Sequence, residues 1–80
     1  MAENVTIQTI SESPTTLSGL NSIMILNGSD TNPLRLIISG ATEHIDLTSG
    51  QTLTLTAYAG FTLPDLELSG VELTANIVKT

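Results

Sequence analysis

Strict alternation of apolar and polar residues from Gln51 to Ala57 is the feature that most constrains the fold of this chain. A side-chain period of two is typical of a β-strand with one buried face, because successive side chains point to opposite faces. The same period recurs in three further stretches, residues 43–47, 66–68 and 71–78. The residues that these patterns place toward a core include Ile45, Leu47, Leu53, Leu55, Val71, Leu73, Ala75 and Ile77. The sequence therefore predicts an all-β protein, with Thr52, Thr54 and Thr56 on a solvent-facing side.

Two further segments, residues 22–26 and 34–38, are apolar on both faces of a strand. Runs of this kind suit strands that are covered on both sides. One small domain has too few other apolar residues to cover both faces of both strands, and soluble monomers rarely expose large apolar patches. We therefore expect contacts between subunits, in which an N-terminal arm pairs with a neighbour's sheet edge. The predicted interface residues are Val5, Ile7, Ile10, Met24 and Ile37.

Clusters of Gly, Asn, Asp, Ser and Pro separate the predicted strands. The longest is Asn27–Pro33, whose Asn-Gly pair is typical of a β-hairpin. Strand starts recur at roughly eight to twelve residues, the spacing of a sandwich or barrel. We expect roughly six to seven short antiparallel strands in a small β-sandwich or barrel at residues 22–80. Residues 1–21 are predicted to form an N-terminal arm or edge strand and a polar connection.

Charge excludes several classes of partner. The formal net charge is −6, and Arg35 and Lys79 are the only basic residues. Nucleic acids and anionic membranes both require clustered cations, so neither is an expected partner. The apolar runs are far shorter than the roughly 20 residues of a membrane-spanning helix.

The chain has 80 residues and no cysteine, so no disulfide can stabilise it. Small domains without disulfides or metals commonly gain stability from association, which favours a homo-oligomer. The first four residues, Met1–Asn4, lack the basic and apolar regions of a signal peptide. We therefore expect synthesis and folding in a cytoplasm.

His44 is the single histidine, and Glu43 and Asp46 lie close to it in sequence. In a strand, His44 and Asp46 share one face while Glu43 points to the other. Acid–base catalysis also needs a shaped pocket and a partner nucleophile, which the pattern does not supply. We therefore expect no enzyme, no catalytic residue and no cofactor.

Two loops carry candidate ligand-binding residues. Asn27, Asp30 and Asn32 offer oxygen atoms on one loop, but one carboxylate is too few for a typical calcium site, and Asx turns explain the same residues. No metal is therefore expected. Tyr58 and Phe61 flank Gly60 on the second loop, where they could form a sugar-stacking platform or a turn packed on the core.

The segment Ile45–Thr56 contains a strand, a Ser-Gly-Gln-Thr turn and a second, threonine-rich strand. This pattern, in an acidic chain without cysteine, resembles small structural proteins of tailed-phage virions, such as capsid decoration proteins and fibre or tail modules. The resemblance covers about the last sixty residues. It implies a symmetric oligomer, with a trimer favoured, that is assembled in the host cytoplasm and attached to a capsid or fibre protein.

The leading functional hypothesis is thus a self-assembling virion component that stabilises a capsid or builds an appendage. The alternative is a non-catalytic binding module that recognises a cell-surface glycan or protein through loops 27–33 and 57–64. A capsid or fibre protein is the expected partner in the first case.

Overall fold

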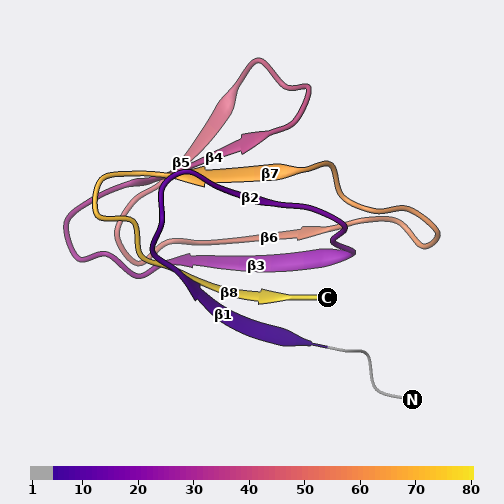
Figure 1. The fold of residues 1–80 in the computed structure, drawn as a ribbon, viewed down its shortest axis with the longest axis horizontal. Coiled ribbons are helices and arrows are strands. Elements are labelled where there is room, and N and C mark those ends of the chain that lie inside the picture. The colour runs from indigo at the N-terminus through magenta and orange to yellow at the C-terminus, as the bar shows by residue number, and fades with distance from the viewer. Residues whose placement is uncertain (1–4) are drawn as a thin grey trace.

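The computed structural model describes residues 5–80, which form two packed antiparallel sheets of four strands each (Figure 1). In chain order the strands are β1 (Thr6–Ile10), β2 (Thr15–Leu17), β3 (Ser22–Asn27), β4 (Leu34–Ile38), β5 (His44–Leu47), β6 (Thr52–Thr56), β7 (Leu66–Ser69) and β8 (Ala75–Lys79). Sheet A has the order β1-β8-β3-β6, and sheet B has the order β2-β7-β4-β5. The predicted all-β, antiparallel, sandwich-like class is confirmed, with eight strands instead of six or seven. Residues 5–80 contain no helix, and so none that is long and apolar enough to cross a membrane.

The core lies between the two sheets and consists of Leu, Ile and Ala side chains. Strands from both sheets alternate buried and more exposed residues, as their sequence period predicts. In β6, Leu53 and Leu55 pack against the core, whereas the three threonines between and around them are exposed. The predicted faces of this strand are therefore confirmed. The buried apolar residues are Ile10, Leu17, Leu20, Ile23, Ile25, Leu34, Leu36, Leu47, Leu66, Leu68, Leu73, Ala75 and Ile77.

The last strand begins later than the sequence period indicates. Residues 71–74 form a turn, in which Glu72 has a positive φ of 50°. Val71 is consequently 72 % exposed instead of inward-facing, while Leu73 is buried. The alternating pattern of residues 71–78 was therefore interrupted by a turn that hydrophobic periodicity does not reveal.

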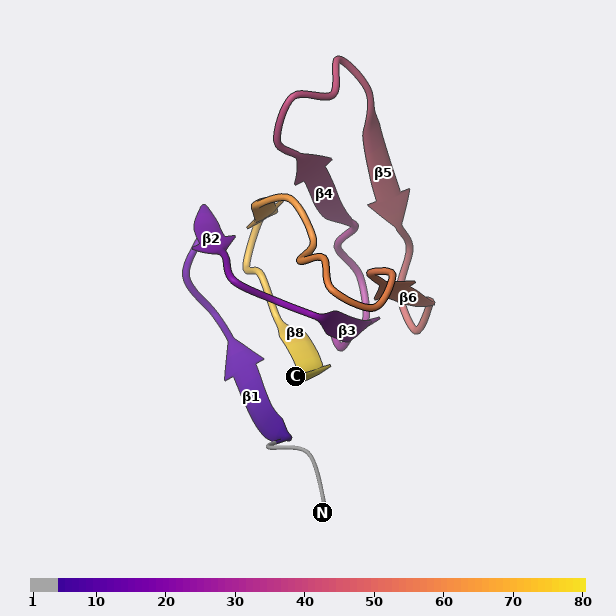
Figure 2. The same cartoon turned by 90° about the vertical axis from the view of Figure 1, so that its right-hand side faces the viewer.

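The β4–β5 hairpin projects from the body of the sandwich (Figure 1, Figure 2). Ile45 lies opposite Leu36 in the strand register, on the inner side of sheet B. Because β5 is the edge strand of this projecting hairpin, Ile45 is 38 % exposed, whereas Leu36 is fully buried. The inward direction predicted for Ile45 is thus correct in phase, but the predicted burial is incomplete.

The N-terminal segment forms an edge strand on its own sheet. β1 pairs with β8 from Thr6 opposite Lys79 to Ile10 opposite Ala75. Ile10 is 4 % exposed and belongs to the chain's own core. It was predicted to contact another subunit, but its side chain packs within the same chain. Residues 1–4 of the predicted segment 1–21 lie outside the described residues. The predicted polar connection contains a further short strand, β2, which pairs with β7 and buries Leu17.

Candidate functional site

Asn27 joins two turns at one end of the sandwich. Its side chain is 2 % exposed, and its amide nitrogen donates to the carbonyl oxygens of Asn32 and Leu47, both at 2.9 Å. Its amide oxygen accepts a hydrogen bond from the backbone N–H of Ser29 at 3.0 Å, which is the expected Asx turn. The amide therefore holds the β3–β4 loop against the end of β5. Of the three predicted ligand residues here, Asp30 is exposed and Asn32 is half-buried, whereas the Asn27 side chain is occupied by the fold.

The structure separates the two predicted ligand loops. Ser22 at the start of β3 lies opposite Thr56, and Leu26 near its end lies opposite Thr52. The loop with Tyr58 and Phe61 therefore follows one end of sheet A, and the Asn27 loop follows the other, roughly 15 Å away along the strands. Figure 1 shows the two loops at opposite ends of the long axis. They do not form one continuous site.

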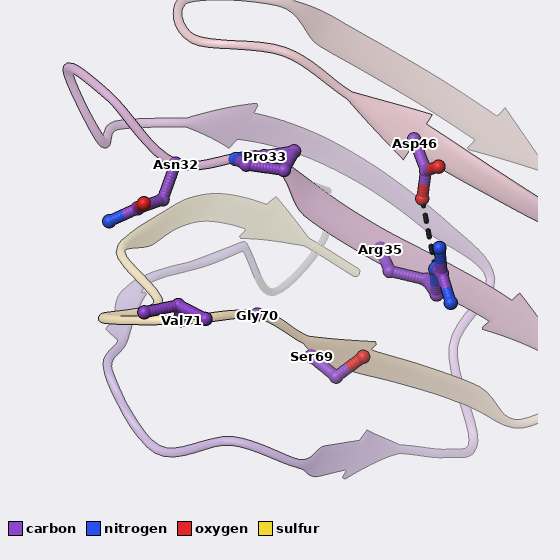
Figure 3. A pocket seen from close by; sticks show the side chains of 7 residues that line it. All are labelled: Asn32, Pro33, Arg35, Asp46, Ser69, Gly70 and Val71. Atoms are coloured by element: carbon purple, nitrogen blue, oxygen red, sulfur yellow. Dashed lines mark hydrogen bonds and ion pairs between the residues drawn. The ribbon is translucent and has the colours of Figure 1, made fainter.

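A group of charged side chains lies on the outer face of sheet B. Arg35 Nε donates to Asp46 Oδ1 at 3.1 Å (Figure 3). His44 Nε2 lies 3.5 Å from Asp46 Oδ2. The hydrogen bond from Arg35 lowers the pKa of the Asp46 carboxyl, and the positive charge of Arg35 and the proximity of His44 act in the same direction. His44 and Asp46 share this face, as the strand period predicts.

A shallow pocket of about 270 Å³ adjoins the ion pair of Arg35 and Asp46. Ser69 also lines it, but Ser69 lies opposite Arg35 on β7, and Asp46 lies opposite Arg35 on β5. A Ser-His-Asp arrangement needs the histidine to contact the serine, but His44 on β5 lies opposite Ile37. Two strand spacings and a two-residue offset, roughly 12 Å, therefore separate the backbones of His44 and Ser69, and β4 runs between them. Residues 5–80 also contain no group of three His, Cys, Asp or Glu side chains placed to hold a metal ion.

The outer face of sheet A differs because its strands present only uncharged side chains. The register places Ile7, Val78 and Met24 side by side across β1, β8 and β3. Ile7 is 80 % exposed and Met24 is 41 % exposed, while Val78 is half-buried. We call this surface the neutral face. Its members on the described strands are Ile7, Thr9, Ser22, Met24, Leu26, Thr52, Thr54, Thr56, Asn76 and Val78.

The two predicted interface residues in the middle strands lie on opposite outer faces. Met24 belongs to the neutral face, whereas Ile37 lies on sheet B between Glu67 and His44. Ile37 is half-buried among polar neighbours, while Met24 continues an apolar row. Sequence analysis did not assign Val78 to this row. The sequence could have indicated this position, because Val78 follows the inward-facing Ile77 in the strand and must therefore point to the outer face.

Tyr58 and Phe61 lie on a tight turn between β6 and β7, which we call the aromatic turn (residues 58–61). Tyr58 is 87 % exposed and Phe61 is 71 % exposed. The alternative that this turn packs on the core is therefore wrong. A depression of about 320 Å³ lies beside the turn and is lined by residues of both the turn and the adjacent end of sheet A.

The geometry thus defines a class, a small antiparallel β-sandwich with one charged and one neutral outer face. The chain matches no protein-family model, no curated protein and no solved structure.

Proposed function

We propose that this protein is a non-catalytic structural subunit that associates with further copies of itself through the neutral face, as a component of a virion capsid or appendage. The observation that supports this most strongly is the row of Ile7, Val78 and Met24 on a face without charged strand residues. Contiguous exposed apolar surface of this kind commonly marks a contact with another protein.

Electrostatics favour the same face. The chain carries a formal net charge of −6, so two copies repel each other unless their acidic residues stay apart. The outer face of sheet B presents Asp46 and Glu67, whereas the strands of the neutral face present none. Two neutral faces can therefore approach with the least repulsion and the largest burial of apolar surface. In a closed trimer, different parts of the neutral face of each copy would contact the two neighbouring copies.

The virion setting is supported by the resemblance of residues 45–56 to small structural proteins of tailed phages. These residues form β5, the following turn and most of β6. In this proposal a capsid or fibre protein is the further partner, and a trimer is the favoured assembly.

The test is the mass of the protein in solution, measured by light scattering on a sizing column from about 1 µM to about 100 µM. The intact protein is expected to elute as an oligomer. Met24→Lys places a charge in the middle of the neutral face and should give a folded monomer. Thr16→Lys, an exposed substitution on the outer side of sheet B, is the matched control and should leave the oligomer intact.

Thermal unfolding of both variants shows whether each is folded. A monomeric intact protein over the whole concentration range would contradict self-association. An oligomer that survives Met24→Lys but dissociates with Thr16→Lys would place the contact on the other sheet.

A further inference from the structure

The aromatic turn carries all the Tyr and Phe residues of the chain and lies outside the core. Tyr58 and Phe61 are its only aromatic residues, and both are largely exposed. Aromatic side chains bury more apolar surface than any others, so a small protein gains most stability by placing them inside. This core is instead built from Leu, Ile and Ala. The two rings therefore contribute little to folding, which makes recognition the better explanation for their position.

Backbone hydrogen bonds fix the turn that carries the two rings. The backbone N–H of Phe61 donates to the carbonyl oxygen of Tyr58 at 3.0 Å, and Gly60 supplies the positive φ of 87° that closes the turn. Both flanks are fastened to the segment before β3. Ala57 N–H donates to Asn21 at 2.8 Å, and Leu63 N–H donates to Leu20 at 2.7 Å.

Leu63 also packs against the core, so the base of the loop is anchored by both side-chain packing and hydrogen bonds. A surface held in its binding geometry loses less conformational entropy when a ligand binds. The aromatic turn projects at one end of the long axis, where a large ligand can reach it (Figure 1).

The depression beside the turn has a neutral, polar lining. Besides the turn itself and Ala57, it is formed by Asn21, Ser22, Thr56 and Thr80. Ser22 Oγ and Thr80 Oγ1 are 2.7 Å apart and share a hydrogen bond. None of the described side chains that line this depression is charged. It therefore combines two aromatic faces with hydroxyl and amide groups.

We propose that the aromatic turn and this depression bind a neutral saccharide. A pyranose ring has an apolar C–H face, which can stack on Tyr58 or Phe61, and a rim of hydroxyl groups, which can bond to Asn21, Ser22 and Thr80. The volume of about 320 Å³ lies at the lower end of the range for small-molecule sites, and suits one or two sugar units. An anionic sugar is disfavoured because no Lys or Arg lines the site and the chain is acidic.

This proposal goes beyond self-association and shares only Ser22 and Thr56 with the neutral face. A surface that binds another protein is the competing assignment for exposed aromatics. The lining favours the saccharide, because its hydroxyl and amide groups can bond to sugar hydroxyls and it offers no charged side chain to pair with a charged residue of a protein partner.

The experiment begins with an array that presents neutral, sialylated and sulfated glycans. The best neutral glycan is then titrated into the protein while tyrosine fluorescence is recorded. Because the chain has one Tyr and no Trp, this signal comes from Tyr58 alone. A saturable change is expected. Phe61→Ala should weaken binding at least about tenfold, as the loss of a recognition residue does.

Val71→Ala is the matched control, because Val71 is 72 % exposed and lies on a different turn. It should bind like the intact protein. Tyr58→Ala removes the fluorophore, so glycan binding by this variant is measured by calorimetry. By the same reasoning, its affinity should fall at least about tenfold.

Four results would overturn the proposal. The first is an array on which no neutral glycan binds, and the second is binding of sialylated or sulfated glycans alone. The third is unchanged sugar binding in Phe61→Ala and Tyr58→Ala. The fourth is loss of the oligomer in these two variants of a protein that binds no sugar. The last result would assign the aromatic turn to a protein contact. The readouts also separate the two proposals, because Met24→Lys tests the oligomer and Phe61→Ala tests the sugar site.

Discussion

Replacing Asn27 by Ala should strongly destabilise the fold, although the residue lies at the end of a strand. The substitution removes two donated hydrogen bonds, to Asn32 and Leu47, and one accepted from Ser29. The bond to Leu47 is buried, so its carbonyl oxygen is left without that partner in a place with little access to water. The backbone bonds of Asn27 to Gln51 and Gly50 remain, so the change reports the side chain alone.

The magnitude follows from the three lost bonds. A typical hydrogen bond contributes about 1 kcal/mol net, and an unsatisfied buried acceptor costs about 1–3 kcal/mol. With about 1 kcal/mol for each of the two part-buried bonds and about 1–3 kcal/mol for the buried one, the free energy of unfolding should fall by about 3–5 kcal/mol. At roughly 0.05–0.15 kcal/mol per residue, a domain of this size has a total stability of only about 4–12 kcal/mol. The Ala variant should consequently lose a large fraction of it.

Urea unfolding followed by circular dichroism measures this loss, at one protein concentration because association shifts apparent stability. Asn76→Ala is the control, and both substitutions are compared in the Met24→Lys background, because Asn76 belongs to the neutral face. Asn76 is exposed and its side chain accepts one hydrogen bond, from Thr9 at 3.0 Å, so its loss should cost less than about 0.5 kcal/mol. Equal, small effects of both substitutions would refute the reasoning, and would mean that water replaces the Asn27 amide at no cost.

Two further predictions concern the charged face and a tight turn. Asp46 has a lowered pKa in the folded protein, so its stabilising contribution is present above the unfolded value near 3.8 and is lost as the pH falls through the lower folded pKa. Asp46→Asn should therefore reduce the acid dependence of the unfolding free energy, and an unchanged pH profile would contradict this. Gly70→Ala should lower stability by about 1–3 kcal/mol in urea unfolding, since the added Cβ would lie 2.8 Å from the carbonyl oxygen of Pro33. An Ala variant as stable as the intact protein would show that the β7–β8 turn can move.

Most strands and their faces could be predicted from the period of two, and the reason is physical. Where one side of a strand is buried, side-chain alternation is imposed by the pleat, as the exposed threonines and inward leucines of β6 show. The prediction failed where local structure overrides that period. Val71 continues the alternation in sequence, but the turn around Glu72 points it into solvent. β2 was missed because three residues, Thr15–Leu17, become a strand only by pairing with β7.

The candidate sites needed information that no local pattern contains. Tyr58 was correctly placed on a loop, whereas Asn27, predicted on a loop, is the last residue of β3. Which loops meet depends on the order and direction of the strands. The antiparallel pairing of β3 with β6 sends the loop after each strand to opposite ends of sheet A. Burial of the Asn27 amide likewise depends on Leu47, twenty residues away in sequence.

The difference between Met24 and Ile37 shows how strand register determines which apolar residues lie together on the surface. In sequence the two residues are equivalent, since each stands in the middle of a run that is apolar on both faces. The fold gives Met24 the apolar neighbours Val78 and, one strand further, Ile7. It gives Ile37 the polar neighbours Glu67 and His44. A single large side chain among charged residues is ordinary protein surface, whereas an apolar row across three strands is a surface that association can bury. The proposed contact therefore depends on the pairing of β1, β8 and β3, and not on the hydrophobicity of either strand alone.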